Sequence, residues 1–284
     1  MRYLLIPHIE VQRANALATA WAITMTPVFA CTLFAHAFGR DIGIQPAGVA
    51  IIHHDAQFLA ESDLPSDLLK DYGDYPHQFR AATYIDKNDY SKHNKHALSL
   101  QPTASMHLEI SLLLLFADTC PSLHQVKTAL SQRRIAGGLI THHGKPSIHE
   151  SFEASLKAIH HGFFITDQSH ELVSTDQGRL ETLLSRVNDS APEGESRRWL
   201  SPAVLGYATL TPFEARNNAR ENAPHAFAEP LVGLVAYQSI RHITAQGLAA
   251  TAQFPCFWRG HWPRDDVFIT HTATLSTIQQ EPSA

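Results

Sequence analysis

Histidine is the residue type that most invites a chemical interpretation of this chain, because nineteen of the 284 residues are histidines. Histidine is the commonest metal ligand and the usual general base near neutral pH. Three adjacent pairs occur, His53-His54, His142-His143 and His160-His161, and each lies in a different predicted element. Neighbouring residues of a strand point to opposite faces, so such a pair cannot chelate one ion. Since no H-E-x-x-H motif occurs either, the spacing predicts no metal site.

Catalytic motifs are also missing. The His54-Asp55 pair resembles that of metal-dependent phosphohydrolases, but those enzymes carry it on a helix and here it ends a predicted strand. The Gly138-to-Lys145 interval is one residue too long for a phosphate-binding P-loop, and Pro146 replaces the Ser or Thr that would hold magnesium. No G-x-S-x-G, G-x-G-x-x-G or Cys/His nucleophile signature is present. The sequence therefore predicts no catalytic residue and no cofactor.

Composition limits the remaining classes of protein. The formal charge of −5 argues against a protein that coats DNA without sequence preference, since such proteins are strongly basic. It leaves room for one that grips a short RNA through a local patch. Cys31, Cys120 and Cys256 are far apart and form no C-x-x-C motif, so we expect buried thiols in a reducing cytoplasm. No run of eighteen apolar residues occurs, which predicts no membrane span.

The elements that must position any site follow a recognisable order in the first half. Apolar, β-branched runs predict strands, and Thr26 followed by Pro27 is typical of a helix start, with Thr26 as the N-cap. The expected elements are a strand at 3–11, a helix at 27–38, strands at 48–52 and 107–116, a helix at 122–134 and a strand at 139–141. This β-α-β-(insert)-β-α-β order is typical of the ferredoxin-like fold, which RNA-recognition modules also use.

The second half is more mixed. We expect a helix at 151–160, a strand at 162–166, a helix capped by Thr175, a flexible linker at 190–196, a strand at 199–211 and an amphipathic helix at 226–242. Phe29, Tyr84 and Trp258 are aromatic residues that could stack on bases, although single aromatic residues more often belong to the core.

Five segments, in order along the chain, resemble those of one family. They are LLIPHIEVQRANA at 4–16, SMHLEISLL at 105–113, RRIAGG at 133–138, GYATLTP at 206–212 and RNNAR at 216–220. Together they resemble the type I-F CRISPR Csy-complex subunit that caps the 5′ end of the guide RNA. The resemblance runs from the N-terminus to about residue 242.

The resemblance implies an α+β fold with a ferredoxin-like, RRM-like core, an inserted thumb-like excursion and a C-terminal extension. The whole chain, 1–284, would form a single RAMP-type domain. Its expected parts are the core at 1–60 and 105–145, the thumb-like insertion at 61–104, and the second half with its extension at 146–284.

The function that the resemblance implies is a non-catalytic, RNA-binding subunit of a type I-F surveillance complex (Cascade). It would bind the 5′ handle of the CRISPR RNA (crRNA) and nucleate assembly with the large subunit and the backbone subunit, and it would contact target DNA only indirectly. Arginine offers planar paired donors to phosphate, and asparagine can donate and accept at bases or 2′-hydroxyls. The expected RNA-binding residues are Gln12, Arg13, Asn15, Arg80, Arg133, Arg134, Arg216, Asn217, Asn218 and Arg220.

Two other functions stay open at this point. One is a metal-independent endoribonuclease that processes CRISPR repeat RNA, with a histidine such as His54 or His107 as general base. The other is a structural subunit that touches protein alone.

Overall fold

A computed structural model gives the fold of the chain. The residues it describes are 1–19, 22–59, 79–82, 100–117, 119–131, 133–173, 178–188, 199–217, 219, 222–245 and 253–280. The predicted linker at 190–196, the Thr175 cap and most of the 61–104 insertion lie outside these residues.

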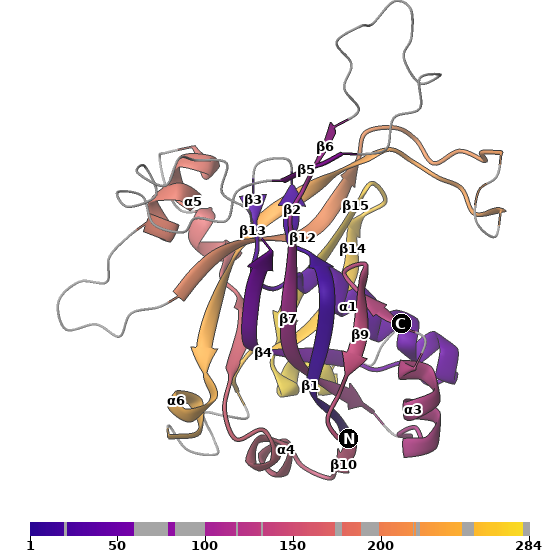
Figure 1. The fold of residues 1–284 in the computed structure, drawn as a ribbon, viewed down its shortest axis with the longest axis vertical. Coiled ribbons are helices and arrows are strands. Elements are labelled where there is room, and N and C mark those ends of the chain that lie inside the picture. Colours follow the sequence, from indigo (N-terminus) through magenta and orange to yellow (C-terminus); the bar gives the residue numbers. More distant parts are fainter. Residues whose placement is uncertain are drawn as a thin grey trace, which may run out of the picture.

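A large antiparallel sheet of eleven strands organises the described part of the chain (Figure 1). Its strands are β1 (Arg2–Asn15), β4 (Gly48–Leu59), β7 (Ser105–Phe116), β8 (Arg134–Ile135), β9 (Gly138–His142), β10 (Ser147–His149), β11 (Phe163–Asp167), β12 (Trp199–Thr209), β13 (Ala228–Ser239), β14 (Phe257–Arg264) and β15 (Val267–Ala273). Two small sheets pair β2 (Leu17–Thr19) with β3 (Ala22–Ile23), and β5 (Phe79–Ala82) with β6 (Leu100–Thr103).

Helices cover both faces of the sheet. They are α1 (Val28–Ile42), α3 (Leu123–Leu130), α4 (Phe152–Ala158), the 3-10 helix η2 (Ser169–Leu172), α5 (Arg179–Asn188), α6 (Ile240–Ala245) and α8 (Leu275–Gln280). Buried residues of α1 and α3 join the core on one face, and those of α4, α6 and α8 join the core on the other. Among the described helices, none is long and apolar enough to cross a membrane.

The central strands lie in the order β4-β7-β1-β9, each antiparallel to its neighbour. The position of β7 between two cores explains why its sequence is a continuous apolar run and does not alternate between apolar and polar residues. Leu112 and Leu114 face the core under α1 and α3, whereas Leu113 and Leu115 face the core under α4, α6 and α8. A strand that is buried on both faces needs apolar side chains at every position.

The strands of the second half close on themselves. Strand β14 pairs with β4, and the pairing continues through β15, β12 and β13 to β11, which pairs again with β4. The result is a ring of six strands that shares β4 with the central sheet. The fully buried Trp258 links two strands of this ring, because its indole N–H donates to the carbonyl of Ile165 at 2.9 Å. Trp258 is therefore a core residue, and the suggestion that it stacks on bases was wrong.

Each strand and helix expected in the first half is present, and β1 and β4 are longer than expected. The helix expected at 122–134 ends at Leu130, and Arg134 begins the unpredicted strand β8. The predicted amphipathic helix at 226–242 is wrong. Residues Ala228–Ser239 form β13, and the chain becomes helical only at Ile240. The backbone of β13 pairs with β12 along its length and with β11 over Val235–Ser239, and this pairing overrides the helical periodicity of the side chains.

Candidate nucleic-acid interface

A hollow of about 320 Å³ lies where β1 ends, and four parts of the chain meet there. We name it the α1 pocket. Its walls come from the end of β1 with β2 and β3, the turn between β8 and β9, the first turn of α1, and β12. The lining residues are Asn15, Leu17, Ala18, Thr24, Pro27, Val28, Phe29, Ala30, Ala136, Gly137, Val204 and Tyr207. None of these lining residues is an aspartate or a glutamate, so the pocket wall carries no negative side chain.

The glycine-rich turn between β8 and β9 is held tightly against the end of β1. Ala136 and Gly137 both have positive φ angles, of 48° and 76°, as a two-residue hairpin turn requires. The Asn15 N–H donates to the carbonyl of Ala136 at 2.8 Å. A Cβ on Gly138 would lie 2.7 Å from the backbone nitrogen of Ala14, so only glycine permits this approach. The turn therefore has a set position at the mouth of the pocket.

Asn15 and Arg13 lie together at this end of β1. The Asn15 side chain accepts from the Leu17 N–H and donates to the Leu17 carbonyl, both at 3.1 Å, so its amide already shapes the turn into β2. Arg13 sits at an irregularity of the β1–β7 pairing with φ of 56°. Its side chain is exposed. Of the two, Arg13 is thus the one whose side chain is available to a ligand.

Arg134 approaches from the neighbouring strand. Its guanidinium Nη1 donates to the carbonyl of Gly137 at 3.1 Å, which holds it beside the turn while it remains exposed. The adjacent Arg133 does something different. It forms an ion pair with Asp41 near the C-terminal end of α1. At a rise of 1.5 Å per residue, Asp41 lies about 20 Å along the helix from the first turn of α1 at the pocket. Arg134 and the Asn15 backbone therefore both bond the β8–β9 turn, whereas the Arg133 side chain is held at the other end of α1.

The N-terminus of α1 reaches the pocket without a side-chain cap. Pro27 occupies the N-cap position, and no side chain among the described residues caps an N–H of the first turn, although the Val28 N–H donates to the Thr26 carbonyl at 2.9 Å. The predicted cap, Thr26, is wrong because its hydroxyl is engaged elsewhere: Oγ1 lies 2.9 Å from His53 Nδ1 and accepts from the Tyr237 hydroxyl at 3.3 Å. The free N–H groups of a helix start carry a partial positive charge and bind anions. An uncapped helix start at a pocket lined without acids favours a phosphate there.

The network behind the helix start is buried and uncharged at neutral pH. Burial lowers the pKa of His53 to about 4, against a smaller opposing effect of Asp55. Burial likewise raises the pKa of Tyr237 to about 12, although its hydrogen bond with Thr26 works in the other direction. A neutral His53 can accept the Thr26 hydroxyl proton at Nδ1 while Tyr237 donates to the same hydroxyl. Each hydroxyl proton thus has a partner, which fixes Thr26 behind the first turn of α1.

Two aromatic rings complete the α1 pocket. Phe29 and Tyr207 both line it, and their ring centroids lie 5.0 Å apart in an edge-to-face contact. Tyr207 is 38% exposed. Phe29, from the first turn of α1, was named from the sequence as a stacking residue. Tyr207 was not named as one, although it lies in the GYATLTP segment that carries the family resemblance.

The RNNAR segment lies elsewhere, on the arm that joins β12 to β13 and projects at the upper right of Figure 1. Arg216 pairs with Glu214 at 3.7 Å, and its guanidinium carbon lies 4.7 Å from the centre of the Phe227 ring. Asn217 is exposed in a turn. Asn218 and Arg220 lie outside the described residues, as does the side chain of Arg80, whose backbone belongs to β5.

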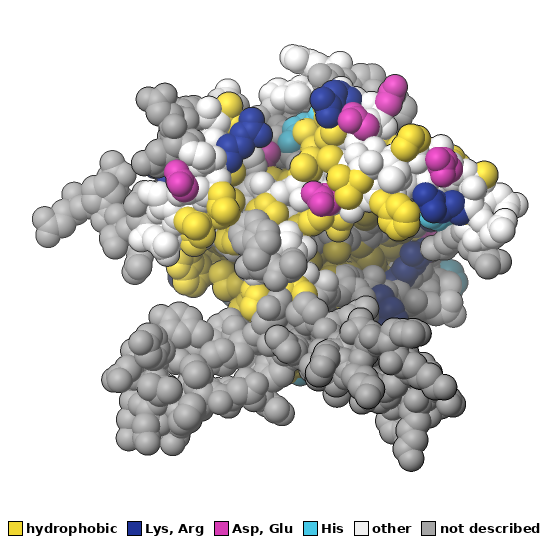
Figure 2. Space-filling view, turned by 90° about the horizontal axis from the view of Figure 1, so that it is seen from above, with side chains coloured by type: hydrophobic (Ala, Val, Ile, Leu, Met, Phe, Trp, Pro, Cys, Tyr) yellow, Lys and Arg dark blue, Asp and Glu magenta, His cyan; other side chains and the backbone are white. Residues whose placement is uncertain are grey.

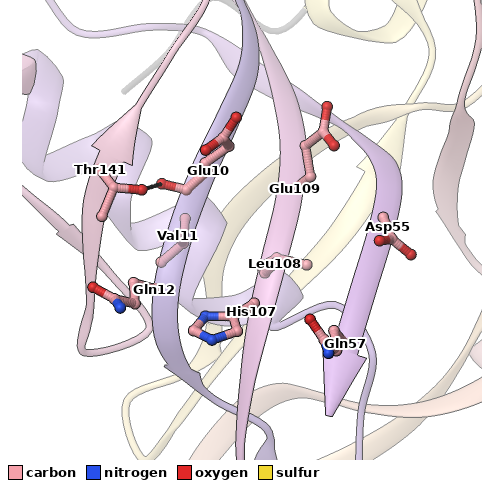
Figure 3. A pocket seen from close by; sticks show the side chains of 9 residues that line it. All are labelled: Glu10, Val11, Gln12, Asp55, Gln57, His107, Leu108, Glu109 and Thr141. Carbon is pink, nitrogen blue, oxygen red and sulfur yellow. Dashed lines mark hydrogen bonds between the residues drawn. The ribbon is translucent and has the colours of Figure 1, made fainter. Parts of the chain in front are cut away.

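Gln12 lies in a second hollow, of about 330 Å³, on the sheet face that α1 does not cover (Figure 3). Three carboxylates stand directly opposite one another there: Asp55 on β4 faces Glu109 on β7, which faces Glu10 on β1. Like charges in such positions repel one another and would repel a phosphate. The Gln12 side chain therefore lies in acidic surroundings that do not favour RNA.

Histidines from separate elements meet next to these carboxylates, which the spacing of the adjacent pairs did not reveal. The rings of His8, His54 and His161 lie with their centroids 4.4 to 5.6 Å apart. The hydroxyl of the fully buried Ser111 is hydrogen-bonded to His54 Nε2 at 2.6 Å, and it accepts from the backbone N–H of His8 at 2.9 Å. Burial lowers the pKa of His54 to about 4, with His8 adding to the effect. Within the described part of the chain, no group of His, Cys, Asp and Glu has the arrangement of a metal site.

Comparison with known proteins gives one clear match. The family described as CRISPR-associated protein (Cas_Csy2) matches residues 4–267 of this chain. Among solved structures, the chain is similar to a CRISPR protein from Archaeoglobus fulgidus, with 9% identity over 96% of this chain and 100% of that chain. The TM-score of that pair is 0.30, too low to assign a fold. No curated protein matches the sequence.

Proposed function

Because the chain belongs to the Csy2 family of CRISPR-associated proteins, we propose that it is a non-catalytic subunit of a type I-F CRISPR surveillance complex and holds the 5′ handle of the crRNA. The observation that carries this proposal is the α1 pocket. A helix start without a side-chain cap and a pair of aromatic rings line one hollow that has no acid in its lining, Arg134 is bonded to its Gly137, and the exposed Arg13 lies two residues before its Asn15.

These groups match the parts of a nucleotide. The backbone N–H groups at the start of α1 suit a phosphate, and Arg13 and Arg134 supply long-range positive charge beside it. Tyr207 and Phe29 offer ring edges and faces on which a single-stranded base can stack. The β8–β9 turn is held against β1 by the close approach of Gly138, and it places Ala136 and Gly137 in the pocket lining. Recognition of a short, defined RNA needs this combination and no net positive charge on the whole protein.

We propose that residues 1–60 and 105–145 form a ferredoxin-like, RRM-like core. Along the chain, β1, α1, β4, β7, α3 and β9 follow the βαββαβ order of that fold. In the sheet the four strands lie in the order β4-β7-β1-β9, with α1 and α3 packed on one face. On the same proposal, residues 61–104 are an insertion, since β5 and β6 pair only with each other among the described strands. Residues 146–284 then form the second half and extension of a single RAMP-type domain.

The proposed partners are the large subunit and the backbone subunit of the same complex, with the crRNA between them. Target DNA would be recognised indirectly, through base pairing with the guide. The endoribonuclease alternative has less support. His54, its proposed base, is bonded to the buried Ser111, and the hollow that His107 lines also holds the carboxylates Glu10, Asp55 and Glu109. A cleavable phosphate would have to approach those charges.

A binding measurement with two matched double variants tests the handle site. Arg13→Ala with Arg134→Ala removes both exposed arginines beside the α1 pocket, whereas Arg179→Ala with Arg241→Ala removes two exposed arginines from α5 and α6. Losing a hydrogen bond to a charged group costs about 1.5–3 kcal/mol. The first variant should therefore raise the Kd for handle RNA by roughly 100-fold or more, and the second by less than about threefold.

The salt dependence supplies an independent reading from the same anisotropy titrations. Each lost phosphate contact should lower the slope of log K against log salt concentration by about 0.7 for a single strand. A change of about 1.4 is thus expected for the first variant and none for the second. Equal losses in the two variants, or an unchanged slope in the first, would contradict a handle site at this pocket.

A further inference from the structure

A larger hollow lies between α1 and β14, and we name it the α1–β14 pocket. Its volume is about 680 Å³, about twice that of the α1 pocket. The second and third turns of α1 form one wall, and β14 forms another. None of its lining residues is an aspartate or a glutamate. The helix that borders the α1 pocket at its first turn therefore borders this second cavity farther along its length.

The two pockets adjoin at a pair of aromatic rings. Phe29 lines the α1 pocket and Phe268 lines the α1–β14 pocket, and their ring centroids lie 5.9 Å apart in an edge-to-face contact. Tyr207, which also lines the α1 pocket, lies opposite Phe268 in the pairing of β12 with β15. The two cavities are therefore neighbours, with one pair of rings between them.

The α1–β14 pocket offers one indole ring that is open to solvent. Trp262 is 55% exposed, and its ring centroid lies 5.2 Å from that of Phe268. The other tryptophan of the lining, Trp258, is fully buried and is not available for stacking. Figure 2, a view from above, shows hydrophobic side chains gathered between charged ones on the face that it presents. A planar ligand in this pocket can therefore lie against Trp262.

The polar groups of this lining favour an anionic ligand. Arg259 is partly buried there, and His36 and His261 are exposed. Guanidinium and imidazole groups donate to phosphate oxygens, and exposed aromatic rings stack on unpaired bases. Cavities of about 300–1,000 Å³ with apolar walls and a few polar groups are typical of sites for small ligands. The α1–β14 pocket thus combines the size, the ring and the nitrogen donors that suit one nucleotide.

We propose that the α1–β14 pocket binds one nucleotide, with its base against Trp262 and its phosphate toward the arginine and histidines of the lining. The source that the structure favours is the RNA strand held at the α1 pocket, because the two pockets adjoin at Phe29 and Phe268. The inference rests on the proposed function for this source only. A free mononucleotide has the same chemistry, and the test below distinguishes the two sources.

The test is an abasic scan of the handle RNA with the full chain. Each RNA lacks one base, and fluorescence anisotropy gives its Kd for wild type, Trp262→Ala and the control Trp199→Ala. The two tryptophans are matched, since they are 55% and 54% exposed. Loss of a stacked base weakens binding by about fivefold or more. In wild type, we expect such a loss at two neighbouring positions, one for each pocket.

Trp262→Ala should bind the intact handle at least about fivefold more weakly and should become insensitive at one of these two positions only. Trp262→Phe, which keeps a ring, should recover most of the affinity, and Trp199→Ala should behave as wild type. Thermal melting of each variant separates lost binding from lost folding. His36→Ala with His261→Ala removes exposed side chains alone and should also weaken handle binding, whereas the equally exposed pair His124→Ala with His160→Ala should not.

Melting in the presence of 5′-AMP identifies the source of the nucleotide. A rise in Tm that Trp262→Ala removes, with an abasic scan that the variant leaves unchanged, would support the nucleotide site and assign it a free nucleotide. Wild-type handle binding by folded Trp262→Ala, together with no effect of 5′-AMP on wild type, would overturn the inference, as would equal losses in Trp199→Ala. A folded Trp262→Ala chain that loses only copurified protein would also overturn it. Sensitivity at the Trp262-dependent position alone, with Arg13→Ala and Arg134→Ala without effect, would refute the handle site at the α1 pocket and leave this pocket standing.

Discussion

Acidification should destabilise this protein through His53, whose buried ring holds Thr26 behind the start of α1. The pKa of His53 is lowered from 6.5 to about 4 in the folded chain, because burial disfavours the charged imidazolium. The unfolded chain binds the proton more readily than the folded chain between these two pKa values. The free energy of unfolding therefore falls as the pH drops below about 6.5 and stops falling once the pH is below about 4.

The size of the effect follows from the two pKa values. At pH 5 an unfolded histidine of pKa 6.5 is almost fully protonated, and a folded one of pKa about 4 is about one-tenth protonated. Linkage then gives a loss of about 2 kcal/mol from this one residue. A loss of that size is a large fraction of the total stability of a typical protein. His54 should act in the same direction, since its pKa is also lowered to about 4.

Urea unfolding at a series of pH values between 4.5 and 8 measures the effect, with His53→Gln as the comparison. Glutamine cannot titrate in this range but can still accept a hydrogen bond from Thr26. The other histidines are common to both proteins, so the difference between the two curves isolates His53. Wild type should lose about 2 kcal/mol more than the variant between pH 7.5 and pH 5.

Parallel curves for wild type and His53→Gln would refute the argument, because they would mean that His53 takes up a proton as readily in the folded chain as in the unfolded one. Wild type losing less than the variant would reverse the sign, and would indicate that an acid pairs with the ring in the folded state.

Two further substitutions test the fold around the site. Trp258→Phe removes the indole N–H that the buried Ile165 carbonyl accepts, so it should lower the free energy of unfolding by about 1–3 kcal/mol in denaturant titrations; an unchanged stability would mean that this bond does not hold the strand ring. Gly138→Ala places a Cβ 2.7 Å from the Ala14 nitrogen, so it should cost about 1–3 kcal/mol and weaken handle-RNA binding by moving the β8–β9 turn; tolerated substitution with full RNA affinity would remove the turn from the site.

Local sequence patterns were enough to predict the first half of the chain. The apolar runs around residues 48–52 and 107–116 have few polar residues because the strands they form are buried on both faces. Gly137 and Gly138 turn the chain from β8 into β9, where the first has a positive φ and the second approaches β1 too closely for a Cβ. The RNA-binding prediction for Arg13, Asn15 and Arg134 came from short motifs and remains a prediction; of the three, Asn15 lines the α1 pocket and Arg134 bonds its Gly137.

Long-range pairing decided the rest. Residues 228–239 have a helical pattern of apolar side chains, yet they form a strand because β11 and β12 offer backbone partners on both sides. Thr26 precedes a helix as a cap should, yet its hydroxyl bonds His53 and Tyr237, which approach from 27 and 211 residues away. Periodicity and capping rules describe what a segment prefers by itself. Strand partners and buried polar partners far away in the chain outweigh those preferences, since each unpaired buried group costs more than a local preference contributes.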